Sequence, residues 1–374
     1  MNLQIKEVKC RKDLKKWVDF PNKLYKSNPY YVPFLMNDEL DTFTKEKNPA
    51  YDFCESRQFL AYKGKKIVGR IGAIINHAAN EKWGTNAIRF TRFDFIDDYE
   101  VSKALFDTVV SWGKEKGFTK ILGPIGFTDM DHEGMLVEGY EEFNMSITFY
   151  NHPYYLEHME KLGLTKEVDW VEYQLTVPKE VDPKLEKMSE FLQNRYGYEL
   201  VVYKDRKKLS NDAYEAFKVI DEAFSKLYGT VPLTDAVINK AVGDYIPLVH
   251  LDYICSVKDN AGKIAGFAVL VPSIAKALKK SNGRMLPFGI FRLLKALKGK
   301  NDTLEMFFIA VKPEHQKRGV PAIIMNQMLK MCIKNGVKYC ETGPELEVNE
   351  DVQGLWKGFD VRHHKRRRCF NKDI

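Results

Sequence analysis

The residues with the clearest chemical character lie between positions 304 and 322. Residues 304–311 are almost continuously apolar, as in a buried strand, and Gln316, Arg318 and Gly319 follow before an apolar pattern of helical period. A short loop that opens a helix aims backbone N–H groups and the positive end of the helix at one point. Glycine permits close backbone approach, and arginine adds a charged donor. The loop is predicted to bind a pyrophosphate, with an ordinary strand-to-helix turn as the alternative.

A carboxylate precedes this loop on the same predicted strand. Glu305 stands eleven residues before Gln316. Beside Phe307 and Phe308 it would lie in apolar surroundings, which suit a general base that takes a proton from an ammonium group. A solvent-facing glutamate at the strand end is the alternative.

A second group of polar residues lies in the first half of the chain. An acidic loop with one histidine could hold an amine substrate, and a solvated loop is the alternative. No set of residues has the spacing of metal ligands, so no metal is expected. The substrate candidates in this half are Asp131, His132, Glu133, Asn151, Tyr154 and Tyr155. For the last three, capping and core roles compete with ligand contact.

The elements that would position these residues occur twice along the chain. Each half has a β-hairpin, an apolar strand, a helix of 3.6-residue period and a short strand that ends in Gly-Pro. The pairs are 59–75 with 253–271, 88–96 with 304–311, 101–116 with 320–334, and 123–124 with 343–344. The repeated order predicts a duplicated α/β domain, each copy a mixed central β-sheet flanked by helices. We expect domains at 1–178 and 184–374, the second with a basic amphipathic insertion at 276–303.

The loop at 316–322 resembles the (R/Q)-x-x-G-x-(G/A) signature of the GNAT superfamily of acyl-CoA N-acyltransferases. Gln316 to Val320 fit, but Pro321 stands where Gly or Ala is expected, and Ala322 follows. Proline removes one N–H and is tolerated in the first helical turn. The resemblance implies acetyl-CoA or a longer acyl-CoA as cofactor. It also implies that the cofactor contacts Phe308, Ile309, Ala310, Val311, Gln316, Lys317, Arg318, Gly319, Val320, Ala322 and Asn349.

The resemblance also suggests catalytic roles. It implies that Glu305 is the general base and that a backbone N–H near Ile309–Val311 stabilises the oxyanion. Family members place a tyrosine, the general acid, seven residues after an asparagine, and here Trp356 follows Asn349 at that spacing. Indole cannot donate the proton, so Trp356 is interpreted as a substrate-pocket wall. The acid would then come from Tyr154 or Tyr155, or from solvent.

The first half departs from the signature. Its counterpart of the loop, 93–102, carries Asp94, Asp97, Asp98 and Glu100, which would repel phosphate. The first domain is therefore predicted to be GNAT-like but to lack the pyrophosphate loop. The chain resembles bacterial tandem proteins with one working and one degenerate half.

Composition limits the function classes. The chain has 374 residues and a net charge of +7, and six scattered cysteines suggest reduced thiols. No signal peptide or membrane span is expected, and a cytoplasmic protein is predicted. Residues 276–300 hold eight cations and 362–372 hold six, with no acid in either. This favours local anionic contacts over specific nucleic-acid binding.

The leading hypothesis is an acyl-CoA-dependent N-acyltransferase that transfers an acetyl or longer group to a primary amine. One alternative is a non-catalytic acyl-CoA-binding or regulatory protein. Another is a long-chain acyltransferase that acts on a lipid amine, because 276–300 alternates cations with large apolar residues at helical spacing. That pattern predicts a peripheral contact with the inner membrane face, with packing of the apolar side on the domain as the alternative.

Overall fold

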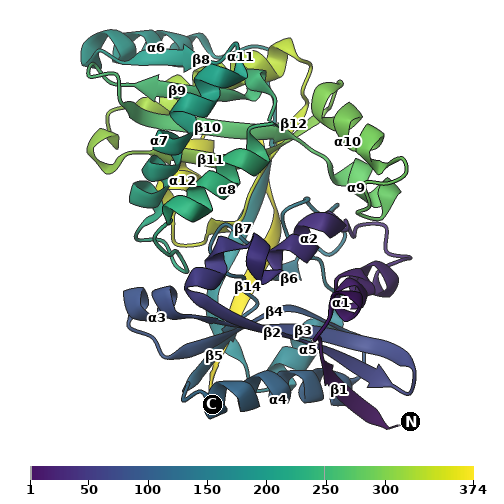
Figure 1. The fold of residues 1–374 in the computed structure, drawn as a ribbon. Helices are drawn as coiled ribbons and strands as arrows, with labels where there is room; N and C mark the ends of the chain where they lie inside the picture. The colour runs from purple at the N-terminus through teal and green to yellow at the C-terminus, as the bar shows by residue number, and fades with distance from the viewer. Residues whose placement is uncertain (1, 248) are drawn as a thin grey trace. The chain divides into compact units, whose positions relative to one another are not determined.

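A computed structural model describes residues 2–247 and 249–374. These residues form two compact units (Figure 1). The first comprises the described residues within Met1–Val171, Ala275–Ile290 and His364–Ile374, and the second those within Glu172–Ile274 and Phe291–His363. The units are therefore not two contiguous stretches, because an insertion segment and the C-terminal strand of the second half belong to the first unit.

The first unit contains a mixed sheet in the order β1-β2-β3-β4-β5, continued by parts of β14 and β7, with β6 paired to β14. The pairs β1 to β4 are antiparallel, β4 and β5 are parallel, and β14 is antiparallel to β5. The bounds are β1 Leu3–Glu7, β2 Cys54–Lys63, β3 Lys66–Asn76, β4 Ala87–Phe95, β5 Lys120–Gly123, β6 Met135–Glu138, β7 Thr165–Thr176 and β14 Val361–Asp373.

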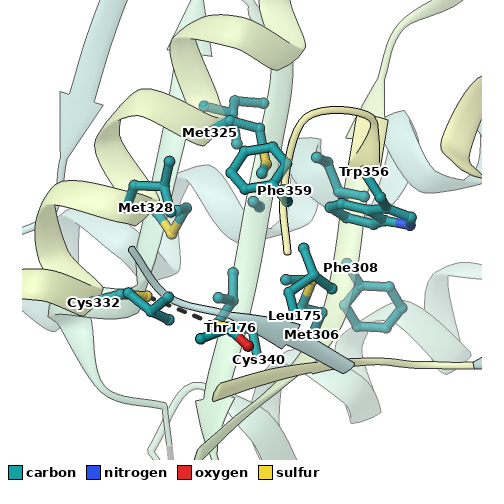
Figure 2. A pocket seen from close by; sticks show the side chains of 16 residues that line it. Leu175, Thr176, Met306, Phe308, Met325, Met328, Cys332, Cys340, Trp356 and Phe359 are labelled. Atoms are coloured by element: carbon teal, nitrogen blue, oxygen red, sulfur yellow. Dashed lines mark hydrogen bonds between the residues drawn. The ribbon is translucent and has the colours of Figure 1, made fainter. Parts of the chain in front are cut away.

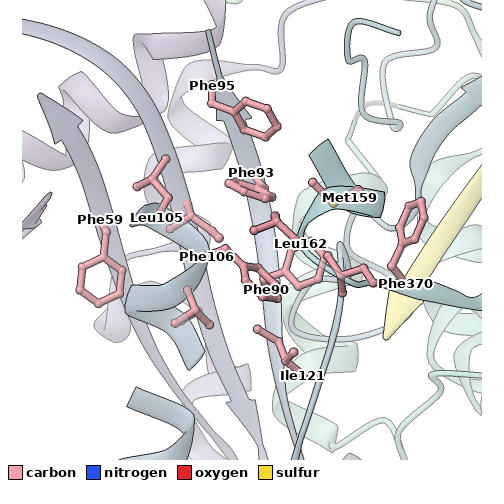
Figure 3. Close-up of a cluster of buried hydrophobic side chains, with 14 of the residues drawn as sticks. Phe59, Phe90, Phe93, Phe95, Leu105, Phe106, Ile121, Met159, Leu162 and Phe370 are labelled. Carbon is pink, nitrogen blue, oxygen red and sulfur yellow. The ribbon is translucent and has the colours of Figure 1, made fainter. Parts of the chain in front are cut away.

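Helices flank this sheet. Asp98 caps α4 by accepting a hydrogen bond from the Glu100 amide. A side-chain carbon added at Gly69 would lie 2.7 Å from Leu105 Cδ1, so the glycine allows α4 to pack closely on β3. Phe370 of β14 lies in the same core as Leu105 (Figure 3). The bounds are α1 Arg11–Leu24, α2 Met36–Thr42, α3 His77–Trp83, α4 Tyr99–Glu115 and α5 Tyr154–Lys161, with short 3-10 turns η1 Lys45–Lys47 and η2 Pro49–Asp52.

The second unit has the strand order β7-β12-β11-β10-β9-β8, with β13 paired to β7. β11 and β12 are parallel, whereas β12 with β7, β11 with β10, β10 with β9 and β9 with β8 are antiparallel. The strand bounds are β8 Glu199–Val202, β9 Ile254–Lys258, β10 Ile264–Pro272, β11 Thr303–Val311, β12 Tyr339–Thr342 and β13 Glu345–Leu346. This second mixed sheet with flanking helices confirms the predicted fold class.

The two faces of this sheet are covered by different helices. Met306 and Ile309 of β11 pack in the cluster that contains the α11 residues, whereas Phe308 contacts Phe217 of α7. The helix bounds are α6 Pro183–Tyr196, α7 Arg206–Phe224, α8 Asp235–Tyr245, α11 Val320–Lys334 and α12 Glu350–Gln353, with 3-10 turns η3 Leu251–Tyr253, η4 Pro313–His315 and η5 Gly354–Trp356.

The insertion forms two short helices, α9 Ala275–Ser281 and α10 Gly289–Lys298, as its periodicity predicts. Lys279 Nζ donates to the carbonyl oxygens of Asn28 and Tyr31, at 2.8 and 2.7 Å, which anchors α9 on the first unit. In the described residues, no helix is both long and apolar enough to cross a bilayer.

Candidate functional site

The central feature of the second unit is a gap between two parallel strands. β11 and β12 pair from Thr303 with Tyr339 to Met306 with Thr342. Beyond this point β11 continues along β10 to Val311, whereas the chain after Thr342 leads to β13 beside β7. The strands therefore diverge, and residues on both sides of the gap lose their neighbour in the ladder.

A β-bulge lies at the point of divergence. Leu270 of β10 faces Met306, and the next residue, Val269, faces Phe308. Phe307 is thus an extra residue in β11, and a bulged residue is left out of the regular ladder. At the bulge, Phe307 and Phe308 turn toward the α7 side of the sheet.

The predicted pyrophosphate loop follows β11. Its turn requires left-handed backbone at Lys317, φ 63°, and at Gly319, φ 77°. In the part of the chain that the structure describes, the amides of Lys317, Gly319 and Val320 have no hydrogen-bond partner. Gln316, Lys317 and Arg318 are exposed. Three free N–H groups and two cations at a helix start fit an anionic pyrophosphate.

The departure from the signature at Pro321 leaves the helix intact. Proline occupies the first turn of α11, and the helix runs for 15 residues from Val320. The loop is also closely packed, because a side-chain carbon at Gly319 would lie 2.5 Å from Leu192 Cδ1 of α6.

An apolar pocket of about 540 Å³, part of it open to solvent, lies between α11, the sheet and the segment after α12 (Figure 2). Met325 and Met328 of α11 face Phe359 and Trp356 across it. Its lining residues are Leu175, Thr176, Val177, Ala268, Leu270, Met306, Phe308, Ile309, Ile324, Met325, Met328, Leu329, Cys332, Cys340, Trp356 and Phe359. Of the expected cofactor contacts, Phe308 and Ile309 line the pocket. Ala310 is buried farther along β11 and Val311 packs in the adjoining cluster.

A second apolar cavity, about 610 Å³ with part open to solvent, lies on the other face of the sheet under α7 and α8. Phe217, Phe307 and Phe308 supply aromatic lining. One wall is polar, because Tyr203 donates to Asp212 at 3.0 Å and shares a 2.5 Å hydrogen bond with Ser256. Phe308 lines both cavities, so β11 separates them at the bulge. No local sequence pattern predicts this cavity, since its lining comes from distant segments.

Glu305 is buried, with 2% of its surface exposed, and its Oε1 accepts a hydrogen bond from Ser273 Oγ at 2.6 Å. Leu304 and Met306, its neighbours on β11, pack in the cluster with α11. By strand alternation Glu305 therefore faces the α7 side, as Phe307 does. The alternative of a solvent-facing strand end is wrong, because β10 and Ser273 cover this position.

Trp356 lines the pocket and pairs with a carboxylate that sequence reasoning missed. Its Nε1 donates to Glu345 Oε1 at 3.0 Å and Oε2 at 3.1 Å. Burial raises the pKa of Glu345 to about 7, against the opposing effect of hydrogen bonds from Trp356 and Thr342. The only local signal was a glutamate directly after Gly343-Pro344. Asn349 takes the N-cap position of α12, but its side chain makes no capping hydrogen bond.

The polar candidates of the first unit form internal networks. Asp131 accepts from Arg92 at 2.6 and 2.9 Å, and Arg92 also pairs with Glu39. Burial opposes ionisation, yet the charge of Arg92 and the hydrogen bonds from His132 and Arg92 hold the pKa of Asp131 far below its usual value. Burial raises the pKa of Glu133. The alternative of a solvated loop is therefore wrong for Asp131, which lies in a buried ion-pair network.

The other candidates of this unit bond to the backbone or the core. Asn151 bonds both backbone groups of Leu136. Tyr154 donates to the Phe95 carbonyl, and Tyr155 accepts from the Phe95 amide at 3.0 Å. These contacts fix the end of β4. The connection from β4 to α4 is only residues 96–98, shorter than the 312–319 loop of the second unit.

Among residues 2–247 and 249–374, no group of three or more His, Cys, Asp or Glu side chains could hold a metal ion.

The comparisons with known proteins agree with this geometry. Residues 220–360 match the Acetyltransferase (GNAT) family. The chain is 25% identical over 370 residues to Protein YghO of Escherichia coli (strain K12), which covers 97% of this chain and 94% of that protein. It is also 25% identical over 384 residues to Bacterial ceramide synthase of Caulobacter vibrioides (strain NA1000 / CB15N), covering 100% and 98%.

A solved structure shares the whole fold. It is a tandem GNAT protein from the clavulanic acid biosynthesis pathway, with a TM-score of 0.58 and 12% identity, and the match covers 100% of this chain and 98% of that chain. At this identity the likeness concerns the fold alone, and it extends over both halves of the chain.

Proposed function

Since the chain belongs to the GNAT superfamily of acyltransferases, with the fold present in tandem, we propose that its second unit transfers an acyl group from an acyl-CoA to a primary amine. The observation that carries this proposal is the arrangement along β11. An anion cradle lies at the end of the strand, and an apolar pocket and a buried carboxylate lie along it.

The donor would extend from the loop along the strand. The amides of Lys317, Gly319 and Val320 would hold the pyrophosphate, with Lys317 and Arg318 as its counter-charges. The acyl part would enter the pocket lined by Phe308 and Ile309. Methionine side chains adapt to irregular apolar ligands, and Met306, Met325 and Met328 line this pocket. This supports an acyl group longer than acetyl.

The chain's own residues would supply the first half of the chemistry. Glu305 lies in the dry interior of β11 and would accept the proton of the ammonium group as nitrogen attacks the thioester carbonyl. Ser273 would orient this carboxylate through its 2.6 Å hydrogen bond. A backbone N–H at the Phe307 bulge would stabilise the oxyanion.

We further propose that the amine is lipid-like. The cavity on the α7 side is aromatic and apolar, and it adjoins the bulge through Phe307 and Phe308. Such a cavity suits an aliphatic chain better than a small polar amine. The relative named as a ceramide synthase supports the same substrate class.

The composition and exposure of the insertion support a contact with a membrane surface. Leu286 and Phe288, which precede α10, and Phe291 of α10 expose 78%, 66% and 68% of their surface, whereas Leu293 and Leu297 of α10 are buried. Residues 276–300 carry eight cations and no acid. Large apolar side chains flanked by lysine and arginine suit an anionic bilayer surface. We therefore place the contact with lipid at Leu286–Phe291.

Thiol release tests the enzymatic proposal. Acetyl-CoA and palmitoyl-CoA would each be offered with a short alkyl amine and a long-chain amino alcohol, and free CoA would be measured. We expect release that depends on the amine and is fastest with the two long-chain substrates. Binding of acyl-CoA without release for any amine would favour the non-catalytic alternative. Preference for acetyl-CoA with a short amine would exclude the lipid substrate.

Vesicle flotation tests the membrane contact. The double variant Phe288→Ser and Phe291→Ser should lose binding to anionic vesicles. Phe191→Ser, which alters an aromatic residue of α6 that is 56% exposed, is the matched control and should keep it. Equal flotation of both variants would contradict a contact through this segment.

A further inference from the structure

The proposed reaction leaves one proton without a donor. When the C–S bond of a thioester breaks, the departing thiolate must be protonated, and the position that the family signature gives to a tyrosine holds Trp356. Indole N–H is a hydrogen-bond donor only. We propose that Glu345 donates this proton, as a general acid that has replaced the tyrosine. The assignment rests on the proposed acyl transfer.

Glu345 lies on one side of the gap between the diverging strands. It follows Thr342, the last residue of β12 that pairs with β11, by three positions. Thr342 faces Met306, which precedes the bulge at Phe307. Glu345 thus follows β12, and the bulge lies in β11. These are the two strands that separate at this point. A thioester whose carbonyl lies at the bulge would place its sulfur in the gap between these two strands.

The side chain is held firmly at this place. The Trp356 indole N–H bonds to both carboxylate oxygens, at 3.0 and 3.1 Å. The Thr342 hydroxyl also bonds to Glu345. Thr342 Oγ1 accepts from the Tyr173 amide, so its own O–H is free to donate to the carboxylate. Trp356 in turn lines the apolar pocket, with its nitrogen turned away from Met328 (Figure 2). The Trp356 ring therefore lines the acyl pocket while its N–H donates to the carboxylate of Glu345.

The surroundings suit an acid that works near neutral pH. Burial raises the pKa of Glu345 to about 7, and the two hydrogen bonds to the carboxylate moderate the rise. The groups that oppose this rise are an indole and a hydroxyl, both uncharged. An ordinary thiol has a pKa of about 8.5. A carboxylic acid with a lower pKa transfers its proton to such a thiolate downhill.

The proton balance of a turnover closes with two carboxylates. Glu305 takes one proton from the ammonium group and passes it to water, and it takes a second proton when the neutral amine nitrogen forms the C–N bond. The C–S bond breaks, its electron pair stays on sulfur, and Glu345 gives its proton to that sulfur to form the free thiol. The Glu345 carboxylate then keeps the hydrogen bonds from Trp356 and Thr342. Water returns one proton to Glu345 and removes one from Glu305 before the next turnover.

The leaving group provides the sharpest test. Glu345→Gln keeps an oxygen for the Trp356 N–H but cannot donate an acidic proton. With acyl-CoA and a saturating amine we expect kcat to fall about 10²–10⁴-fold. With the acyl thioester of an aromatic thiol, whose thiolate leaves unprotonated, the variant should match the wild type within a few fold. Glu347→Gln, two residues along the chain, is the control and should be unaffected on both donors.

The pH dependence gives a second kinetic test. In the wild type kcat should fall as pH rises through about 7, because the acid form of Glu345 is lost. Trp356→Phe removes a hydrogen bond that lowers this pKa, so the fall should move to higher pH. In Glu345→Gln the fall should disappear.

Carbon-13 NMR of labelled glutamate in the free protein measures the titration of the Glu345 side chain in the absence of turnover. One side-chain resonance should titrate near pH 7 and be absent from Glu345→Gln. Dissociation constants for CoA, measured by calorimetry, should agree within a few fold between wild type and variant, which separates a chemical role from a folding defect.

Three results would overturn the assignment. These are full kcat of Glu345→Gln with acyl-CoA, an equal loss on both thioesters, or a carboxyl that titrates near its ordinary value. Failure of the wild type to release thiol with any amine would refute the acyl transfer instead. The two failures are therefore distinguishable.

Discussion

The half-buried carboxylate of Glu345 makes stability depend on pH in a direction opposite to that of most acids. Its pKa rises from 4.5 to about 7 on folding, mainly because of burial. Between these pH values the folded state holds a proton that the unfolded state has released. The stabilisation is complete below about pH 4.5 and is lost as pH rises through about 7. The loss amounts to about 3 kcal/mol, because each tenfold change in proton affinity corresponds to about 1.4 kcal/mol.

Glu345→Gln isolates this contribution. Glutamine has the same shape and can still accept from the Trp356 indole, but it does not titrate. Urea unfolding of wild type and variant would be measured between pH 5 and 8, and the difference between the two free energies of unfolding taken at each pH. That difference cancels the titration of every other group. We expect the variant to gain about 3 kcal/mol relative to the wild type across this range.

A flat difference for Glu345→Gln would refute the reasoning, since it would mean that the carboxyl titrates alike in both states. A difference that decreases with rising pH would mean that a cation holds the carboxylate in its charged form.

Three further predictions concern the donor site, the base and the first unit. Gly319→Val places a β-branched residue at φ 77°, 2.5 Å from Leu192, so calorimetry should show CoA affinity reduced by about 1–3 kcal/mol; unchanged affinity would remove the loop from the site. Glu305→Gln should lower kcat about 10²–10⁴-fold with little change in CoA affinity, and full activity at neutral pH would mean that another group takes the proton. Arg92→Met leaves the buried Glu39 and Asp131 carboxylates without their cationic partner, so the free energy of unfolding should drop by about 3–5 kcal/mol. A loss below about 1 kcal/mol would show that these ion pairs are solvated.

Much of the fold could be predicted from the sequence because its signals are local. Alternating apolar residues predicted both hairpins, and helical periodicity predicted α4 and α11 within two residues of their bounds. The loop at 316–322 could be recognised because its chemistry depends on backbone conformation over a few consecutive residues. Glycine at φ 77° and the start of a helix are properties of the chain itself.

Other features depend on contacts between residues far apart in sequence. The alternative of a solvated loop at Asp131 is wrong because Arg92, 39 positions earlier, forms an ion pair with this carboxylate. Ser273 meets Glu305 across the β10–β11 ladder, 32 positions away. Such contacts follow from strand register and burial, which no local pattern records.

The sequence by itself determined the repeated order of elements, the loop and helix start at 316–322 and the resemblance that they carry. Only the tertiary structure decided which chain segments complete each unit, with β14 adding Phe370 to the core of the first. It also decided that Glu345 meets Trp356, and that two apolar cavities adjoin at Phe308. The physical reason is that propensity and periodicity act over single elements. Burial, which sets the pKa of a carboxylate and the shape of a cavity, exists only once distant elements have packed together.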